Sequence, residues 1–178
     1  LQRERLNVFR GKKSVTASGN IKEIFANIGS VEDAETARAA DAEGVGLFRT
    51  EFLYMDRTKA PDEEEQFEAY CKAAKAFSPD PVVIRTLDVG GDKDIPYLHM
   101  DREENPFMGF RAVRYCLENR ELFKTQLRAL LRAGAEGNIR IMIPMVTCLA
   151  EIRGVKALMA ECCEELKAEG KRFDPDIK

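Results

Sequence analysis

The stretch Val45-Gly46-Leu47-Phe48-Arg49-Thr50-Glu51-Phe52 is a short apolar run that follows Gly44 and precedes a polar loop. Its length and composition are typical of a buried β-strand. Longer amphipathic stretches with helical spacing lie on both sides of it. Because short apolar runs that alternate with helical patterns are typical of parallel strands joined by crossover helices, the sequence predicts an α/β fold.

Three further runs have the same character and predict strands at residues 21–28, 82–87 and 139–146. A helix is predicted after each strand. Ser30 and Asp33 have the spacing of a capping box at the start of the first helix, and Gly44 is expected to end it. Pro61 and the acids that follow it are expected to open the second helix, since proline and acidic residues favour a first turn.

The third helix is predicted at residues 111–133, with a break near Asn119, and Gly134 is expected to end it. The fourth follows residue 146 and is expected to stop at Gly170. Its apolar residues recur at helical spacing. These are Ile152, Val155, Met159, Cys162 and Leu166.

Four strand-helix units amount to half of an eight-unit TIM barrel, whereas an open doubly wound sheet is the alternative. Periodicity does not separate the two architectures, because both bury parallel strands on both faces. In either architecture, ligands bind at the carboxyl ends of the strands. The search for functional residues therefore concentrates on those ends.

The amino-acid composition argues against several classes of function. The 178 residues carry 28 Lys and Arg against 31 Asp and Glu, a net charge of −3 that argues against a nucleic-acid or anionic-membrane binder. No run approaches the roughly 20 apolar residues that a membrane span needs, and the start has no signal-peptide core, so a cytoplasmic protein is expected.

The five cysteines lack C-x-x-C spacing and are expected to be reduced, mostly buried thiols. Because Leu1 is not an initiator methionine, the chain is expected to be a piece of a longer one.

Two predicted strands end on the same dipeptide. Arg49-Thr50 closes one apolar run and Arg85-Thr86 closes the next. A guanidinium group at such a place needs an anionic partner because an unpaired buried charge is costly. The partner is either an acid of the chain, with Glu51 expected beside Arg49 and Asp88 after Arg85, or a ligand. Two arginine forks that converge on one point suit a phosphate or a carboxylate.

Other candidates are less specific. The segment 88–94 has adjacent glycines but matches no phosphate-loop or dinucleotide motif, so a tight turn with a solvated charge cluster is favoured over direct contact with a phosphate. Arg111, near Arg114, either extends an anion pocket or pairs with Glu103 and Glu104. His99 has no catalytic neighbour at a recognisable spacing and is interpreted as an exposed loop residue. Residues 63–65 do not share a helix face, so these acids are interpreted as a solvated first turn.

Several motifs, in the same order along the chain, closely resemble enzyme I of the sugar phosphotransferase system, the phosphoenolpyruvate-protein phosphotransferase family. The resemblance starts at about Ile21 and covers nearly all of the remaining chain. The motifs are Gly44-Val45-Gly46-Leu47-Phe48-Arg49-Thr50-Glu51-Phe52-Leu53-Tyr54-Met55-Asp56-Arg57, Arg85-Thr86-Leu87-Asp88-Val89-Gly90-Gly91-Asp92-Lys93, Glu103-Glu104-Asn105-Pro106-Phe107-Met108-Gly109-Phe110-Arg111-Ala112-Val113-Arg114 and Arg140-Ile141-Met142-Ile143-Pro144-Met145.

This resemblance implies the first half of the carboxy-terminal phosphoenolpyruvate-binding TIM barrel at residues 21–178, with residues 1–20 as a leader from a preceding domain. It implies that Arg49 and Arg85 hold the substrate phosphate and that Arg111 lies close by. In that family, phosphoenolpyruvate phosphorylates a histidine of a separate domain, which passes the phosphoryl group to a histidine-bearing carrier protein.

The resemblance also implies what this piece lacks. The family's acceptor histidine, its catalytic cysteine and the carboxylate ligands of its Mg²⁺ cofactor do not match residues here, so no catalytic residue and no metal ligand is expected within the chain. The piece alone is expected to be inactive. A homodimer is expected because a half-barrel leaves unpaired strand edges.

Two alternatives stay open. Pyruvate phosphate dikinases and phosphoenolpyruvate synthases share the barrel and the strand-end arginines, although residues 52–57 favour enzyme I. A non-catalytic half-barrel that binds anions weakly or associates with itself is the alternative from a different class.

Overall fold

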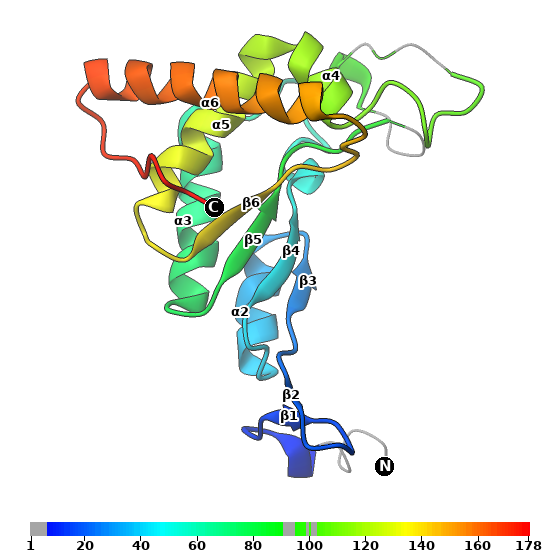
Figure 1. Cartoon of the computed structure of the whole chain (residues 1–178), viewed down its shortest axis with the longest axis vertical. Coiled ribbons are helices and arrows are strands. Elements are labelled where there is room, and N and C mark those ends of the chain that lie inside the picture. The colour runs from blue at the N-terminus through cyan, green and yellow to red at the C-terminus, as the bar shows by residue number, and fades with distance from the viewer. Residues whose placement is uncertain (1–6, 91–94, 99, 101–102) are drawn as a thin grey trace.

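The computed structural model describes residues 7–90, 95–98, 100 and 103–178. A short arm comes first: the 3₁₀ helix η1 (Asn7–Phe9) is followed by β1 (Ser14–Val15) and β2 (Ile21–Lys22), which pair antiparallel. The arm projects from the end of the molecule opposite to α6 (Figure 1). Arg10 and Lys13 of the arm form ion pairs with Asp41 and Glu43 of the main body.

The main body is built on a four-stranded parallel sheet. Its strands are β3 (Ala26–Ile28), β4 (Val45–Arg49), β5 (Val82–Arg85) and β6 (Ile139–Met142), and they lie side by side in chain order. The predicted alternation of strands and helices, and the parallel sheet, are therefore confirmed. An open doubly wound sheet reverses its strand order at a switch point, and the order seen in this sheet has no such reversal.

All four strands are shorter than predicted. The run 21–28 is divided, because Ile21–Lys22 belongs to the arm and only Ala26–Ile28 joins the parallel sheet. At the carboxyl end of β4, the chain turns into the 3₁₀ helix η2 (Thr50–Leu53). The strand was predicted to continue to Phe52, but the backbone leaves the sheet directly after Arg49.

Five helices follow the strands. They are α2 (Val31–Ala39), α3 (Glu63–Phe77), α4 (Val113–Glu118), α5 (Arg120–Gly134) and α6 (Leu149–Ala168). The Ser30–Asp33 capping box and the break at Asn119 are confirmed. The N-cap of α3 is Asp62, which forms a capping box with Glu65, so Pro61 lies just outside the helix. The first helix ends well before Gly44, because Asp41 adopts a φ of 65° that cannot continue it.

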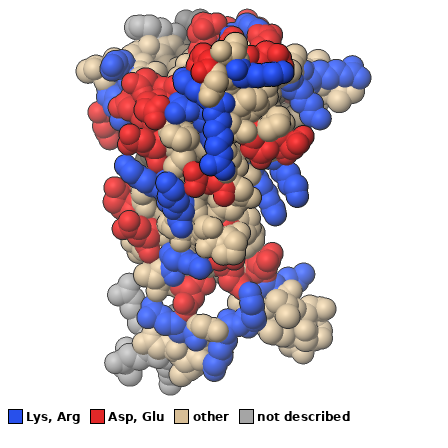
Figure 2. Space-filling model, turned by 90° about the vertical axis from the view of Figure 1, so that its left-hand side faces the viewer, with Lys and Arg blue, Asp and Glu red and all other residues tan. Residues whose placement is uncertain are grey.

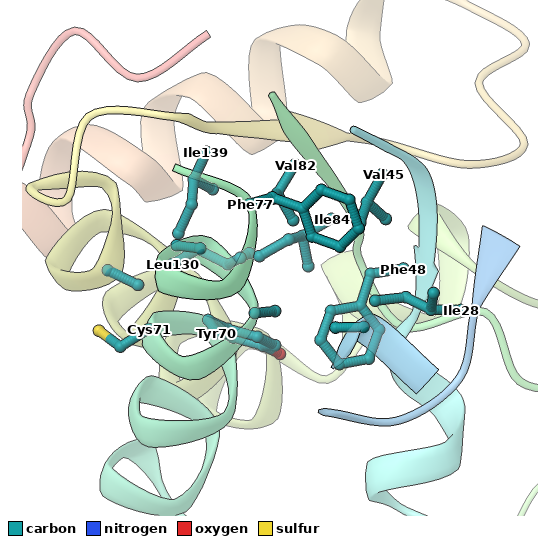
Figure 3. Close-up of a cluster of buried hydrophobic side chains, with 14 of the residues drawn as sticks. Ile28, Val45, Phe48, Tyr70, Cys71, Phe77, Val82, Ile84, Leu130 and Ile139 are labelled. Atoms are coloured by element: carbon teal, nitrogen blue, oxygen red, sulfur yellow. The ribbon is translucent and has the colours of Figure 1, made fainter. Parts of the chain in front are cut away.

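The main core lies between the sheet and helices α2, α3 and α5 (Figure 3). Phe48 of β4 meets Tyr70 of α3 edge to face, with ring centroids 6.1 Å apart. Ile84 of β5 and Leu130 of α5 are fully buried in the same cluster. The buried faces of α3 and α5 thus cover this side of the sheet.

The opposite face of the sheet is less covered. Val83 and Arg85 of β5 are half-buried, while Arg140 of β6 is exposed. At the outer edge of β6, the backbone N–H of Ile141 donates to the carbonyl oxygen of Lys178 at 2.7 Å, and the C-terminus lies beside this strand (Figure 1). The helices therefore pack on one side of the sheet and leave the other side open.

A second cluster of buried residues joins α4, α5 and α6 to the segment that follows β5. Leu87 and Val89 contribute from that segment, and Phe123, Leu158 and Leu166 contribute from the helices. This cluster fixes the chain just beyond the carboxyl end of β5, where the arginines lie. None of the helices in the described ranges has both the length and the apolar character that crossing a bilayer requires.

Candidate functional site: an arginine cluster at the carboxyl ends of β4 and β5

Arg49 and Arg85 are neighbours across two strands. They are the last residues of β4 and β5 and are paired in the register of the parallel ladder. Directly paired residues of adjacent strands project from the same face of a sheet. The two guanidinium groups predicted to converge therefore leave the sheet at the same level and on the same side.

Carboxylates link Arg85 to Arg111. Nη2 of Arg85 donates to Oε1 of Glu51 at 2.6 Å, and its Nη1 lies 3.1 Å from Oδ2 of Asp88. Oδ1 of Asp88 accepts two hydrogen bonds from Arg111, from Nε at 3.0 Å and from Nη2 at 2.8 Å. We call Arg49, Arg85, Arg111, Glu51 and Asp88 the arginine cluster. Both of its carboxylates and Arg111 are buried, whereas Arg49 and Arg85 are half-buried.

Two of the acidic partners differ from those expected. Glu51 pairs with Arg85 on the neighbouring strand rather than with Arg49, because the chain turns into η2 directly after Arg49. Arg111 pairs with Asp88 and not with the acids 103 and 104. The Glu103 carboxylate instead accepts the backbone N–H of Phe110. The internal pairing considered for Arg85 is present, and among the described residues it leaves Arg49 without an acidic partner.

Arg49 contacts an aromatic ring. Its Cζ atom lies over the ring of Phe52, 4.7 Å from the centroid. Within the described ranges, no carboxylate comes within ion-pair distance of this guanidinium group. The buried Nε atoms of Arg49 and of Arg85 also have no hydrogen-bond partner among the described residues. Buried donors without partners are rare in proteins, so these two N–H groups are candidates for contact with a ligand.

The cluster has an excess of positive charge. Three guanidinium groups and two carboxylates leave 3 − 2 = +1 over these five side chains. In a partly dehydrated site such an excess attracts an anion strongly, because the effective dielectric constant is lower than that of water. The cluster is therefore suited to a small anion whose oxygens accept hydrogen bonds from several guanidinium groups.

A buried glutamine of α5 supports the ends of β4 and β5. Oε1 of Gln126 accepts the backbone N–H of Leu87 at 2.8 Å, and its Nε2 donates to the hydroxyl of Thr50 at 3.1 Å. That hydroxyl donates in turn to the carbonyl oxygen of Arg85 at 2.7 Å. One side chain thus contacts the residue after Arg49 and the second residue after Arg85. Gln126 was not among the residues predicted from the sequence, although a glutamine among the apolar residues of a helix is a usable signal.

The network continues into α3. Nε2 of Gln126 also donates to the Tyr70 hydroxyl at 3.1 Å, and the hydroxyls of Tyr70 and Tyr54 both donate to Oε1 of Gln66. Burial raises the pKa of both tyrosines well above the usual range. They are therefore neutral hydrogen-bond donors at any physiological pH and serve as a rigid support beneath the cluster.

Arg111 precedes a strained residue. Ala112 is fully buried and has a φ of 53°, a conformation that is rare for residues other than glycine. A strained backbone conformation of this kind persists only where the surrounding packing holds it in place. Such residues are enriched at functional sites. Nearby Arg114 donates from Nη1 to the carbonyl oxygen of Met108 at 2.8 Å. Arg114 therefore holds the preceding loop and is not part of the arginine cluster.

The remaining candidates lie elsewhere. His99 and residues 91–94 of the glycine-containing segment are outside the described residues. Glu63, interpreted as part of a solvated first turn, instead pairs with Arg128 at 2.6 Å and with Arg132 at 2.7 Å.

The cysteines are free thiols as expected, and three of the five are buried. Among these, burial and the charge of Asp88 raise the pKa of Cys116 to about 12.

The residues of the cluster lack the ligand set of a metal site. Across the described ranges, no three His, Cys, Asp or Glu side chains are grouped as a metal site would need. The two carboxylates of the arginine cluster are engaged with guanidinium groups. These residues do not fit a Mg²⁺ site.

Comparisons with known proteins agree on one family. The model of the family described as "PEP-utilising enzyme, PEP-binding domain" matches residues 3–178. A phosphoenolpyruvate-protein phosphotransferase of Geobacillus stearothermophilus is 53% identical over 157 residues, which is 88% of this chain and 27% of that protein. One of Staphylococcus carnosus is 49% identical over 176 residues, which is 99% of this chain and 31% of that protein.

The match covers nearly the whole chain but under a third of each of these relatives. It includes the strands that carry Arg49 and Arg85 as well as the segment that carries Arg111. The chain therefore belongs to the PEP-utilising enzyme family, in which it corresponds to the PEP-binding domain.

Proposed function

We propose that the arginine cluster binds the phosphate of phosphoenolpyruvate, with Arg49, Arg85 and Arg111 as the binding residues. The observation that carries this proposal is the pairing of Arg49 with Arg85 at the ends of adjacent strands, with one positive charge in excess. The carboxyl ends of parallel strands are where ligands bind in α/β folds. Membership of a PEP-binding family supplies the identity of the anion.

The whole protein's reaction extends this proposal. Relatives carry the name phosphoenolpyruvate-protein phosphotransferase. From the resemblance to enzyme I, we infer that phosphoenolpyruvate phosphorylates a histidine of the whole protein, which then phosphorylates a histidine-bearing carrier protein. Such a transfer needs little covalent chemistry from the protein, because positioning and electrostatic stabilisation lower most of the barrier. The arginines proposed here would stabilise the charge on the oxygens of the transferred group.

The sheet supports a second part of the proposal, that the chain is half of a TIM barrel. Its strands follow chain order and its helices cover one face, as in the wall of a barrel. The open face would then line the barrel interior, and the outer edges of β3 and β6 would pair with further strands. A homodimer and a cytoplasmic location remain predictions, as does Mg²⁺ held by carboxylates outside this chain.

Alanine variants test the phosphate assignment. We expect Arg49→Ala and Arg85→Ala in the full-length protein to weaken binding of phosphoglycolate, a non-reactive analogue, by about 2 to 5 kcal/mol. Isothermal titration calorimetry measures the loss. Arg120→Ala is the matched control, because Arg120 forms an exposed ion pair with Glu161 on the helical side. Unchanged affinity in both cluster variants would refute the assignment.

A separate experiment tests whether this piece is active alone. The chain is incubated with phosphoenolpyruvate, Mg²⁺ and the carrier protein, and phosphorylated carrier is sought by mass spectrometry. We expect none, because the proposed acceptor histidine lies outside the chain. Turnover above that of a no-enzyme control would contradict this expectation.

A further inference from the structure

Phe52 lies at the rim of the arginine cluster without being part of the core. It is in η2, three residues after Arg49, and it is 44% exposed. An exposed aromatic side chain contributes little to core packing. Its ring nevertheless lies under the Arg49 guanidinium group, 4.7 Å from Cζ to the centroid. Contacts of this type attract a cation to the electron-rich face of the ring.

Gly29 leaves room for this ring. It follows directly after β3, and a Cβ atom built on it would lie 2.8 Å from Cδ2 and 3.1 Å from Cε2 of Phe52. Its φ is outside the left-handed region, so conformation does not require glycine here. Glycine is required at this position because the ring of Phe52 approaches the backbone so closely. The ring is thus held between the backbone after β3 and the arginine that ends β4.

The two strand-end arginines are therefore held in different ways. Arg85 lies between the carboxylates of Glu51 and Asp88, which offset its charge. Arg49 is held by a neutral ring, so its charge is not offset by an acid among the described residues. A ring orients a guanidinium group without occupying its outward hydrogen-bond donors, which remain available to a ligand.

We propose that Phe52 is a positioning residue that orients Arg49 for the phosphate and keeps its charge available, and that Gly29 is required for the ring to lie there. This inference rests on the proposed function, because it assigns Phe52 a role only through Arg49. It adds Phe52 and Gly29 to the residues that the proposed function assigns to the site.

Binding measurements on Phe52 variants test the proposal. In the full-length protein, we expect Phe52→Ala to weaken phosphoglycolate binding about tenfold, as expected for a partly dehydrated cation–π contact. Phe52→Leu keeps apolar bulk but has no ring and should lose a similar factor. Phe52→Tyr should restore wild-type affinity. Equal affinity of the Ala, Leu and Tyr variants would overturn the proposal, and thermal unfolding shows that each variant is folded.

Double variants separate positioning from a general structural effect. In an Arg49→Ala background, Phe52→Ala should have no further effect on affinity, because the ring acts through that arginine. Gly29→Ala alone should weaken binding through displacement of the ring, and should have little further effect once Phe52 is alanine. Full additivity in both cycles would overturn the proposal.

The failure of this inference is distinguishable from failure of the proposed function. If Arg49→Ala and Arg85→Ala bind phosphoglycolate like wild type, the phosphate assignment fails, and this inference fails with it. If both arginine variants lose affinity while Phe52→Ala stays within twofold of wild type, only the role of Phe52 fails.

Discussion

Asp88 is the residue on which two of the three cluster arginines depend. One of its oxygens accepts two hydrogen bonds from Arg111, and the other lies 3.1 Å from Arg85. The side chain is only 7% exposed, so little water is available to replace it as a partner. Removing one member of a buried ion pair leaves an uncompensated charge, which costs more than the intact pair contributes.

Asp88→Asn is therefore expected to destabilise the protein. The amide keeps the size of the side chain but leaves Arg111 facing a neutral group, and we expect the free energy of unfolding to fall by about 3 kcal/mol. Urea denaturation followed by circular dichroism measures the change. Glu104→Gln, at an exposed acid, is the control. A loss below about 1 kcal/mol would show that water or another group solvates Arg111.

Thiol reactivity provides another residue-level prediction. Burial and the nearby charge of Asp88 raise the pKa of Cys116 to about 12, so under roughly 0.1% of it is thiolate at pH 8. Because the thiolate is the nucleophile, iodoacetamide should leave Cys116 unmodified in the folded protein. Exposed Cys148 should be alkylated in the same sample, and peptide mass spectrometry distinguishes the two. Equal labelling would mean that the region around Cys116 opens readily.

At the scale of elements, α5 links the helical layer to the ends of two strands. It packs on α3 and α6 through apolar residues, and its buried Gln126 binds both Thr50 after β4 and Leu87 after β5. A purely apolar helix would have left the backbone N–H of Leu87 without an acceptor. The polar residue within the apolar stripe thus fixes where the cluster arginines leave the sheet.

Gln126→Leu tests this link. The substitution keeps an apolar helix face but leaves the Leu87 N–H buried and unsatisfied, which costs about 1 to 3 kcal/mol of unfolding free energy. We also expect weaker phosphoglycolate binding, because the ends of β4 and β5 lose their shared support. Thr125→Val is the neighbouring control, since the Thr125 hydroxyl bonds only the carbonyl oxygen of Glu121 in its own helix. A Gln126→Leu variant as stable as this control would contradict the argument.

At the scale of the whole molecule, ion pairs connect three helices on the side away from the open sheet face. Arg128 of α5 contacts Glu63 of α3 at 2.6 Å and Glu169, just after α6, at 2.7 Å, and Lys171 contacts both acids. Acidic and basic side chains are interspersed over the face in Figure 2. The mixture of signs fits a surface that uses charge for internal pairing rather than for attracting a polyanion.

This ion-pair network predicts acid sensitivity. Hydrogen bonds from Lys171 and Arg128 lower the pKa of Glu169 from 4.5 to about 2. A carboxylate with a lowered pKa stabilises the fold above its unfolded pKa, and that contribution is lost as the pH falls from about 4.5 towards 2. We expect Glu169→Gln to flatten this part of the stability profile, measured by urea denaturation at several pH values. Glu35→Gln, at an exposed position of α2, should leave the profile unchanged.

Local sequence patterns were sufficient for most of the elements. The alternation of apolar runs with amphipathic stretches predicted four strands and their helices, and the Ser30–Asp33 box and the break at Asn119 were confirmed. These features depend on residues a few positions apart, whose backbone and capping preferences act before any tertiary contact forms. Strand ends were predicted too far along because apolar residues continue past the point where the chain leaves the sheet.

The sequence alone placed Arg49 and Arg85 near the carboxyl ends of neighbouring strands, because each follows a short apolar run and is followed by a threonine. Only the tertiary structure decided their partners. The turn into η2 directs Glu51 across to Arg85, and the backbone after β5 brings Asp88 to Arg111. The ring of Phe52 reaches Arg49 only because Gly29 after β3 has no side chain. Such pairings depend on how neighbouring strands and loops meet laterally, and spacing along one chain does not specify that.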